Sequence, residues 1–222
     1  MSDSFLQPRP QTLIVDGVGQ VEEELGRRLG LKLEIFVAAL AVGLSEAAMT
    51  TDNSAATSYG FRMWDGTTRE LRDRASRQGW KAARPGQLEA VRRGDQQVQI
   101  LAAMGDAGVC DPDATPSAAH PRGGSTYVAI QSNQLSFADV ANEAAREEWE
   151  TIQSWWLLYR PTPTEPSRIR AELSLPVEMR GTTITGWATR IFLPIDSNHL
   201  SRRPKLPKPA LAIPVAVERK TS

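Results

Sequence analysis

Residues 168–175 constrain the fold of this chain most, because apolar and polar side chains alternate there without interruption. The apolar positions of the segment are Ile169, Ala171, Leu173 and Leu175. A period of two is typical of a β-strand that buries one face, and such a strand needs neighbouring strands. Residues 155–159 are apolar and aromatic, and residues 182–193 are rich in strand-forming residues. The last third of the chain therefore predicts an antiparallel β-meander.

The first third of the chain has helical periodicity instead. Residues 17–49 carry apolar side chains at spacings of three and four, and Gly30 is expected to divide them into two helices. The second of these is apolar nearly all round, which favours a buried position. Strands are expected at 98–104 and 126–130, and a helix at 136–154. Helices first and strands later predict an α+β fold with N-terminal buried helices and a C-terminal antiparallel meander.

The chain of 222 residues is expected to form one α+β domain over residues 1–198, followed by an extended tail rich in proline and basic residues over 199–222. Cys110 is the single cysteine, which excludes an intrachain disulfide and a cysteine-based zinc site. The N-terminus has no basic region followed by an apolar core, and the longest apolar run, residues 35–44, is too short to span a bilayer. We therefore expect a cytoplasmic protein with no membrane association.

Charges are balanced over the whole chain, which has 26 basic and 26 acidic side chains, but they are distributed in blocks. Residues 62–93 hold nine basic and four acidic side chains, and residues 139–150 hold one basic and five acidic ones. From residue 201 onward there are six basic side chains and one acidic one. Such blocks can meet within the fold, meet between subunits, or attract a charged partner. The sequence leaves these three alternatives open.

The basic block over residues 62–93 is compatible with a helix-turn-helix. Thr67 and Glu70 match a capping box that would open the first helix, and a second helix would begin near Pro85 after a Gly-Trp turn. The arginines expected to contact phosphate groups are Arg69, Arg72, Arg77, Arg84, Arg92 and Arg93, together with Arg202 and Arg203 of the tail. The alternative is an ordinary solvated helix whose arginines pair with Glu70 and Asp73.

A long loop rich in Gly, Pro and Asp is expected over residues 105–124, between the helices and the meander. Its residues Asp106, Asp111, Asp113 and His120 could together supply oxygen and nitrogen ligands to a hard divalent cation. The alternative is turn chemistry, in which an Asp beside Gly or Pro accepts hydrogen bonds from nearby backbone amides. Turn chemistry is the interpretation we favour, and the identity of any metal is left open.

The Pro-Asp pair at Asp113, followed by Glu172 on the polar face of a strand, is similar to the acidic pair of metal-dependent nucleases of the PD-(D/E)xK type. That resemblance implies catalytic roles for Asp113 and Glu172 at a Mg²⁺ site. The sequence departs from the family pattern, because Leu173 and Ser174 stand where the family has a lysine and the two acids are nearly 60 residues apart. The alternative for Glu172 is a cross-strand ion pair with an arginine such as Arg190.

Together these patterns predict a nucleic-acid-associated protein that binds the phosphate backbone through its basic helical region. Whether the protein is also an enzyme is left open. If it is one, the expected activity is that of a metal-dependent nuclease or hydrolase, and Mg²⁺ is required only in that case. The alternative is a protein-interaction or assembly module without catalytic activity, in which the charged blocks meet across a homo-oligomer or contact another protein.

Overall fold

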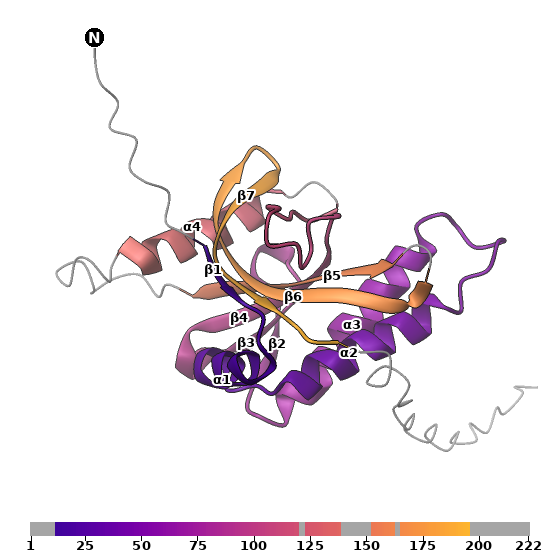
Figure 1. Cartoon of the computed structure of the whole chain (residues 1–222), viewed down its shortest axis with the longest axis horizontal. Helices are drawn as coiled ribbons and strands as arrows, with labels where there is room; N and C mark the ends of the chain where they lie inside the picture. Colours follow the sequence, from indigo (N-terminus) through magenta and orange to yellow (C-terminus); the bar gives the residue numbers. More distant parts are fainter. Residues whose placement is uncertain (1–11, 120–122, 139–151, 163–164, 196–222) are drawn as a thin grey trace, which may run out of the picture.

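The computed structural model describes residues 12–119, 123–138, 152–162 and 165–195 (Figure 1). Its centre is a mixed sheet of seven strands in the order β1-β7-β6-β5-β4-β3-β2. The strands are β1 (Leu13–Val15), β2 (Lys81–Ala83), β3 (Ala90–Arg93), β4 (Val98–Met104), β5 (Gln153–Thr162), β6 (Glu165–Arg180) and β7 (Thr183–Phe192). The helices are α1 (Val18–Leu29), α2 (Leu33–Ala47), α3 (Ser58–Ser76) and α4 (Gly124–Ala138), with short 3₁₀ turns at Pro85–Gln87 and Gly94–Gln96.

The C-terminal strands form the expected meander, since β5, β6 and β7 are antiparallel neighbours in chain order. Gly181 lies in the turn between β6 and β7 with φ of 58°, a conformation that glycine adopts without a steric penalty. β4 pairs in parallel with β5, and β1 pairs in parallel with β7. Parallel neighbours need a crossover connection, and α4 belongs to the one between β4 and β5. The α+β prediction is confirmed.

The N-terminal helices divide where the sequence predicts. Gly30 ends α1 in the left-handed conformation, with φ of 63°, and its N–H donates to the carbonyl oxygen of Gly26 at 2.9 Å. The next helix, α2, is buried on most sides and packs closely on α3. At Gly43 a Cβ atom would lie 2.6 Å from the carbonyl oxygen of Met63, so only glycine permits this approach of the two helices.

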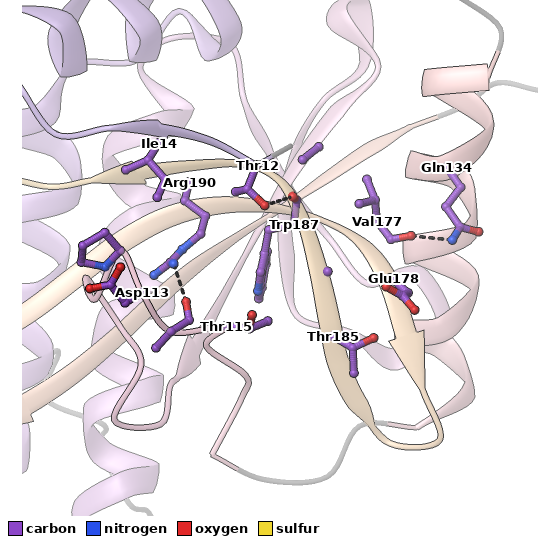
Figure 2. A pocket seen from close by; sticks show the side chains of 14 residues that line it. Thr12, Ile14, Asp113, Thr115, Gln134, Val177, Glu178, Thr185, Trp187 and Arg190 are labelled. Carbon is purple, nitrogen blue, oxygen red and sulfur yellow. Dashed lines mark hydrogen bonds between the residues drawn. The ribbon is translucent and has the colours of Figure 1, made fainter. Parts of the chain in front are cut away.

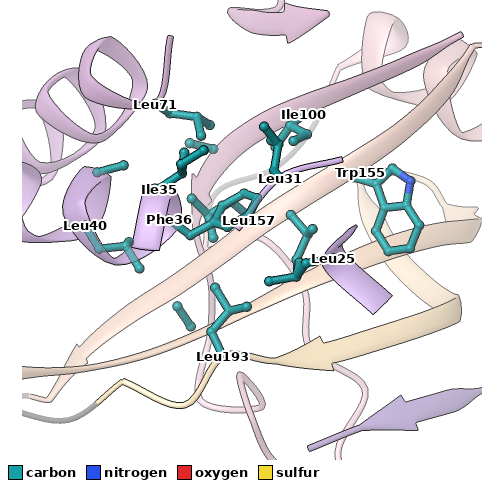
Figure 3. Packing of buried hydrophobic residues seen from close by; sticks show 14 of the residues in the cluster. Leu25, Leu31, Ile35, Phe36, Leu40, Leu71, Ile100, Trp155, Leu157 and Leu193 are labelled. Carbon is teal, nitrogen blue, oxygen red and sulfur yellow. The ribbon is translucent and has the colours of Figure 1, made fainter. Parts of the chain in front are cut away.

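The sheet is covered on both faces, which gives two apolar cores. The larger core lies between the sheet and α1, α2 and α3; Figure 3 shows Leu25, Phe36 and Leu71 of these helices beside Ile100, Trp155 and Leu157 of the strands. The smaller core lies under α4 and the loop of residues 105–119, and includes Leu101, Val109, Ile130, Trp156 and Trp187. Adjacent residues Trp155 and Trp156 thus point to opposite faces, and each is at most 1% exposed.

The strand predicted at 126–130 is wrong, because these residues lie within α4. The run is rich in residues that favour strands, but its buried members recur at helical spacing: Thr126, Ala129, Ile130 and Asn133. Packing of this stripe against the smaller core overrides the local propensity. The helix predicted at 136–154 reaches only Ala138 within the described residues, and Gln153 already begins β5. Residues 139–151 lie outside the described part of the chain.

The predicted helix-turn-helix is also wrong. α3 begins at Ser58, so Thr67 is not a cap but a fully buried residue within the helix. Instead of a second helix, β2 and β3 form an antiparallel hairpin that extends the sheet beside β4. Trp80 and Val91 are buried in the larger core, which draws this segment onto the sheet. Within the described residues, no helix is long and apolar enough to cross a lipid bilayer.

Candidate functional site

Glu172 of β6 and Arg190 of β7 form an ion pair in the interior of the protein. The Glu172 side chain is fully buried and that of Arg190 is 3% exposed. Arg190 Nη2 lies 2.7 Å from Glu172 Oε2, and Arg190 Nε lies 3.0 Å from Glu172 Oε1. Each charge compensates the other where an unpaired charge would be strongly destabilising. The cross-strand pair, which was the alternative role for Glu172, is therefore confirmed.

Arg190 also fastens the loop of residues 105–119 to the sheet. Its remaining donors bind three loop carbonyl oxygens, those of Gly108 at 3.1 Å, Asp111 at 2.9 Å and Ala114 at 2.7 Å. A guanidinium group has five N–H donors, and with the two bonds to Glu172 all five are used. Arg190 consequently has no donor left for a ligand.

Glu172 is saturated in the same way. Its Oε2 accepts from the backbone N–H of Cys110 at 2.7 Å, and its Oε1 accepts from the Ser174 hydroxyl at 2.7 Å. A carboxylate offers about four acceptor positions, and the two bonds from Arg190 occupy the other two. A metal ion could bind Glu172 only by displacing one of these partners. The geometry therefore does not favour the nuclease-like role, which stays a prediction for Asp113 and Glu172.

The aspartates of the loop mostly cap its turns. Asp106 accepts hydrogen bonds from the backbone N–H groups of Gly108 and Ser117, both at 3.0 Å. Asp111 accepts from the N–H of Asp113, also at 3.0 Å. The turn chemistry favoured from the sequence is thus confirmed for Asp106 and Asp111. His120 lies outside the described residues, among which no group of three or more acidic, His or Cys side chains could hold a metal ion.

Cys110 occupies a strained position in the same loop, with φ of 55°. Its Sγ donates to the carbonyl oxygen of Ala171 at 3.1 Å. Burial, and after it the negative charge of Glu172, raises the pKa of the Cys110 thiol to about 12. The thiol is therefore protonated at neutral pH and is unsuited to act as a nucleophile.

A pocket of about 870 Å³ opens beside this ion pair, between the loop, the β6–β7 turn region and β1 (Figure 2). Asp113 and Thr115 of the loop lie on one side, and Glu178 and Thr185 of the β6–β7 hairpin lie on the other. The pocket therefore contains Asp113 but not Glu172. Its size falls within the range of small-molecule sites in proteins.

Most of the arginines predicted to bind phosphate are engaged within the protein. Arg69 pairs with Glu46 and Asp65, and Arg93 pairs with Asp95. Arg72 and Arg84 share Glu89, at 2.6 Å and 2.9 Å. Arg74 pairs with Glu70, as the solvated-helix alternative predicted. Arg77 is exposed and forms no ion pair with any described residue, so the expected pair with Asp73 is not seen. Arg202 and Arg203 lie outside the described residues.

The predicted basic residues do not gather on one face. Arg92 lies on the α4 side of β3, two residues after Ala90 of the smaller core. Arg93, the next residue, therefore points to the opposite side of the sheet. The basic block is instead divided among α3, the β2–β3 hairpin and both faces of the sheet.

One site on the hairpin still brings two cations together. In the register of β2 and β3, Lys81 lies directly opposite Arg92. Arg92 donates only to a neutral group, the side-chain oxygen of Gln99, at 2.8 Å from Nη2. Neither cation forms an ion pair within the described residues.

Sequence reasoning missed Lys81 as a site residue, together with the pocket residues Thr12, Glu178 and Thr185. Strand pairing could have indicated Lys81, had residues 81–93 been assigned to a hairpin. Nothing in the local sequence marks the pocket, whose walls come from distant segments. Neither a family model, nor a curated protein, nor a solved structure matches this chain.

Proposed function

We propose that this protein binds the phosphate backbone of nucleic acid through the β2–β3 hairpin rather than through a helix-turn-helix. The observation that carries the proposal is the strand register, which sets Lys81 opposite Arg92. Like charges at directly opposed positions of an antiparallel pair repel each other. A phosphate group bound between them would remove that repulsion and accept charge-assisted hydrogen bonds from both.

The position of the hairpin supports this role. β2 is the edge strand of the sheet, so Lys81 lies on the last strand of the order. Arg84, which is 74% exposed, follows β2 directly and adds a third cation that shares its acid partner with Arg72.

The neutral partner of Arg92 is also favourable for phosphate binding. Gln99 accepts from Arg92 and donates through its amide to the Ser154 hydroxyl at 2.7 Å. This chain of hydrogen bonds orients the guanidinium group without cancelling its charge. An orienting carboxylate would instead compete with phosphate.

The test is the binding of the purified protein to a labelled mixed-sequence DNA duplex and to a single strand, measured by fluorescence anisotropy at several salt concentrations. Each phosphate contact contributes about −0.9 to the slope of log K against log salt for duplex DNA. The double variant Lys81→Gln/Arg92→Gln should bind more weakly, with a slope reduced in magnitude by about 2.

A control variant removes two exposed positive charges elsewhere, Arg62→Gln/Arg168→Gln. It has the same net charge as the hairpin variant, so a general electrostatic effect would change both equally. Equal losses in the two variants, or no binding at low salt by the unmodified protein, contradict the proposal. The second result would favour the assembly alternative, whose acidic block at 139–150 lies outside the described residues.

A further inference from the structure

The pocket between the 105–119 loop and the β6–β7 hairpin has more free hydrogen-bond acceptors than free donors. The one cation in its wall, Arg190, has every N–H donor bound to protein acceptors. An anionic ligand would therefore find no charged donor there. Among the described residues, the pocket supplies no other basic side chain.

Two carboxylates in the pocket wall retain free acceptor positions. The exposed Asp113 carboxylate forms no hydrogen bond or ion pair with any described residue. Glu178 is 31% exposed and pairs through Oε1 with Arg180 at 3.0 Å, and its Oε2 has no cationic partner among the described residues. The charge that the pocket presents to a ligand is thus negative.

The neutral polar groups add further acceptors. Thr12 uses its hydroxyl proton to donate to the carbonyl oxygen of Trp187 at 2.8 Å, so only its lone pairs remain. Gln134 donates through its amide nitrogen to the carbonyl of Val177, and its side-chain oxygen accepts no hydrogen bond from the described residues (Figure 2). The Thr185 hydroxyl is buried and forms no hydrogen bond with the residues that the structure describes, so it can accept or donate one.

The rest of the wall is apolar and includes Ile14, Val177 and Trp187. An apolar lining with a few acceptors at its edge fits a ligand that has a hydrocarbon body and a donor-rich head. We propose that this pocket binds a small organic cation, a primary amine, amidine or guanidine on an apolar carbon framework, with Asp113 receiving the charged head. This inference is independent of the hairpin function, because the pocket and the hairpin lie toward opposite ends of the sheet order.

Benzamidine and benzoate form a suitable probe pair, because they share one ring and differ in the sign of their charge. Binding is measured by isothermal titration calorimetry and by shifts of backbone amide signals in two-dimensional NMR spectra. For a ligand of this size we expect benzamidine to bind with a dissociation constant of about 0.1–5 mM, and to shift the signals of residues 113–115 and 185–188. Benzoate should bind at least about ten times more weakly.

Asp113→Asn tests the assigned contact, and Asp52→Asn is its matched control. Both residues are exposed and both changes remove one negative charge, but Asp52 lies in the loop between α2 and α3. Asp113→Asn should weaken benzamidine binding about five- to twentyfold, whereas Asp52→Asn should leave it unchanged. Equal binding of benzoate, equal effects of the two variants, or no shift of the pocket signals at about 20 mM benzamidine would overturn the proposal.

Discussion

Two arginine–glutamate pairs fasten peripheral segments to the body of this protein, and they differ mainly in burial. Arg190 pairs with Glu172 and holds the 105–119 loop through three carbonyl oxygens. Arg72 of α3 pairs with Glu89 at 2.6 Å and holds the β2–β3 hairpin through the carbonyl oxygens of Ala83 and Ala90. The first pair is at most 3% exposed, whereas the side chains of the second are 18% and 25% exposed.

The same two residue types therefore tolerate the loss of a partner to different degrees, depending on whether water reaches them. Water can solvate Arg72 and Glu89 if they separate, so the charge that remains after the loss of one partner costs little free energy. Water cannot solvate Arg190 or Glu172 in this way, because either one alone would be a buried charge without an opposite charge beside it.

The largest effect is expected for Glu172→Gln. It removes the negative charge opposite buried Arg190 while keeping nearly the same shape, so the free energy of unfolding should fall by about 3–5 kcal/mol. Urea-induced unfolding followed by tryptophan fluorescence measures this change. A loss below about 1 kcal/mol would show that water reaches the pair and would remove the contrast with Arg72.

The reactivity of the Cys110 thiol indicates whether the 105–119 loop, which the buried ion pair holds, stays in place. Because burial raises its pKa to about 12 from an ordinary value of 9.0, its reaction with a disulfide reagent at pH 8 should be on the order of a hundred- to a thousandfold slower than in the unfolded chain. Absorbance of the released thiol measures the rate. Glu172→Gln should accelerate the reaction, since it removes a negative charge and a hydrogen bond that fix Cys110. An unchanged rate would show that the ion pair does not control the conformation of the loop around Cys110.

A smaller effect is expected for Arg72→Met. The change removes charge-assisted bonds to two backbone carbonyls and to Glu89, which should cost about 1–3 kcal/mol of unfolding free energy. Arg84→Met is the matched control, because Arg84 shares Glu89 but is 74% exposed and should contribute less than about 0.5 kcal/mol. Chemical denaturation of both variants measures the two losses of unfolding free energy. Similar losses for the two would mean that the carbonyl bonds of Arg72 contribute little.

The smallest effect concerns the acid dependence of the exposed pair. The hydrogen bond from Arg72, and after it that from Arg84, lowers the pKa of Glu89 below its ordinary value of 4.5. A carboxyl group whose pKa is lower in the folded state stabilises the fold above its unfolded pKa, and this contribution is lost as pH falls through the folded value. The stability difference between the unmodified protein and Glu89→Gln should therefore be present at pH 7 and shrink as the pH falls below 4.5. Denaturation at several pH values measures it, and a difference independent of pH contradicts the assignment.

Much of the fold could be predicted from periodicity, because burial on one face leaves a repeating pattern. The alternation at 168–175 identified β6, and the helical spacing in 17–49 with Gly30 identified α1 and α2. The prediction failed where propensity and packing disagree. Residues 126–130 resemble a strand locally but lie within a helix. The sequence predicts a second helix from Pro85, but residues 81–93 form the β2–β3 hairpin, which packs on the sheet through Trp80 and Val91.

The candidate sites were less predictable than the fold. The sequence suggested the Glu172–Arg190 pair as an alternative, since both residues lie on strands expected to be neighbours. It could not indicate that all the donors and acceptors of the pair would be used, because three of the partners are carbonyl oxygens of a loop about 80 residues away from Arg190. Every residue has a backbone carbonyl and nearly every residue a backbone N–H, so the sequence does not show which of these groups will bind a given side chain. It therefore could not predict that hydrogen bonds would occupy all the acceptor positions of Glu172, an arrangement that does not favour a nuclease role.

Periodicity and composition were sufficient to predict the strand-rich C-terminal half, the buried N-terminal helices and the numbers of charged side chains. Which of these charges are available to a partner depends on how the whole chain packs. The tertiary structure paired Arg69, Arg72, Arg84 and Arg93 with acids, left Lys81 opposite Arg92, and enclosed Glu172 while exposing Asp113. The physical reason is that periodicity records burial along one element, whereas the availability of a charge depends on residues that only the packed chain brings within a few ångströms.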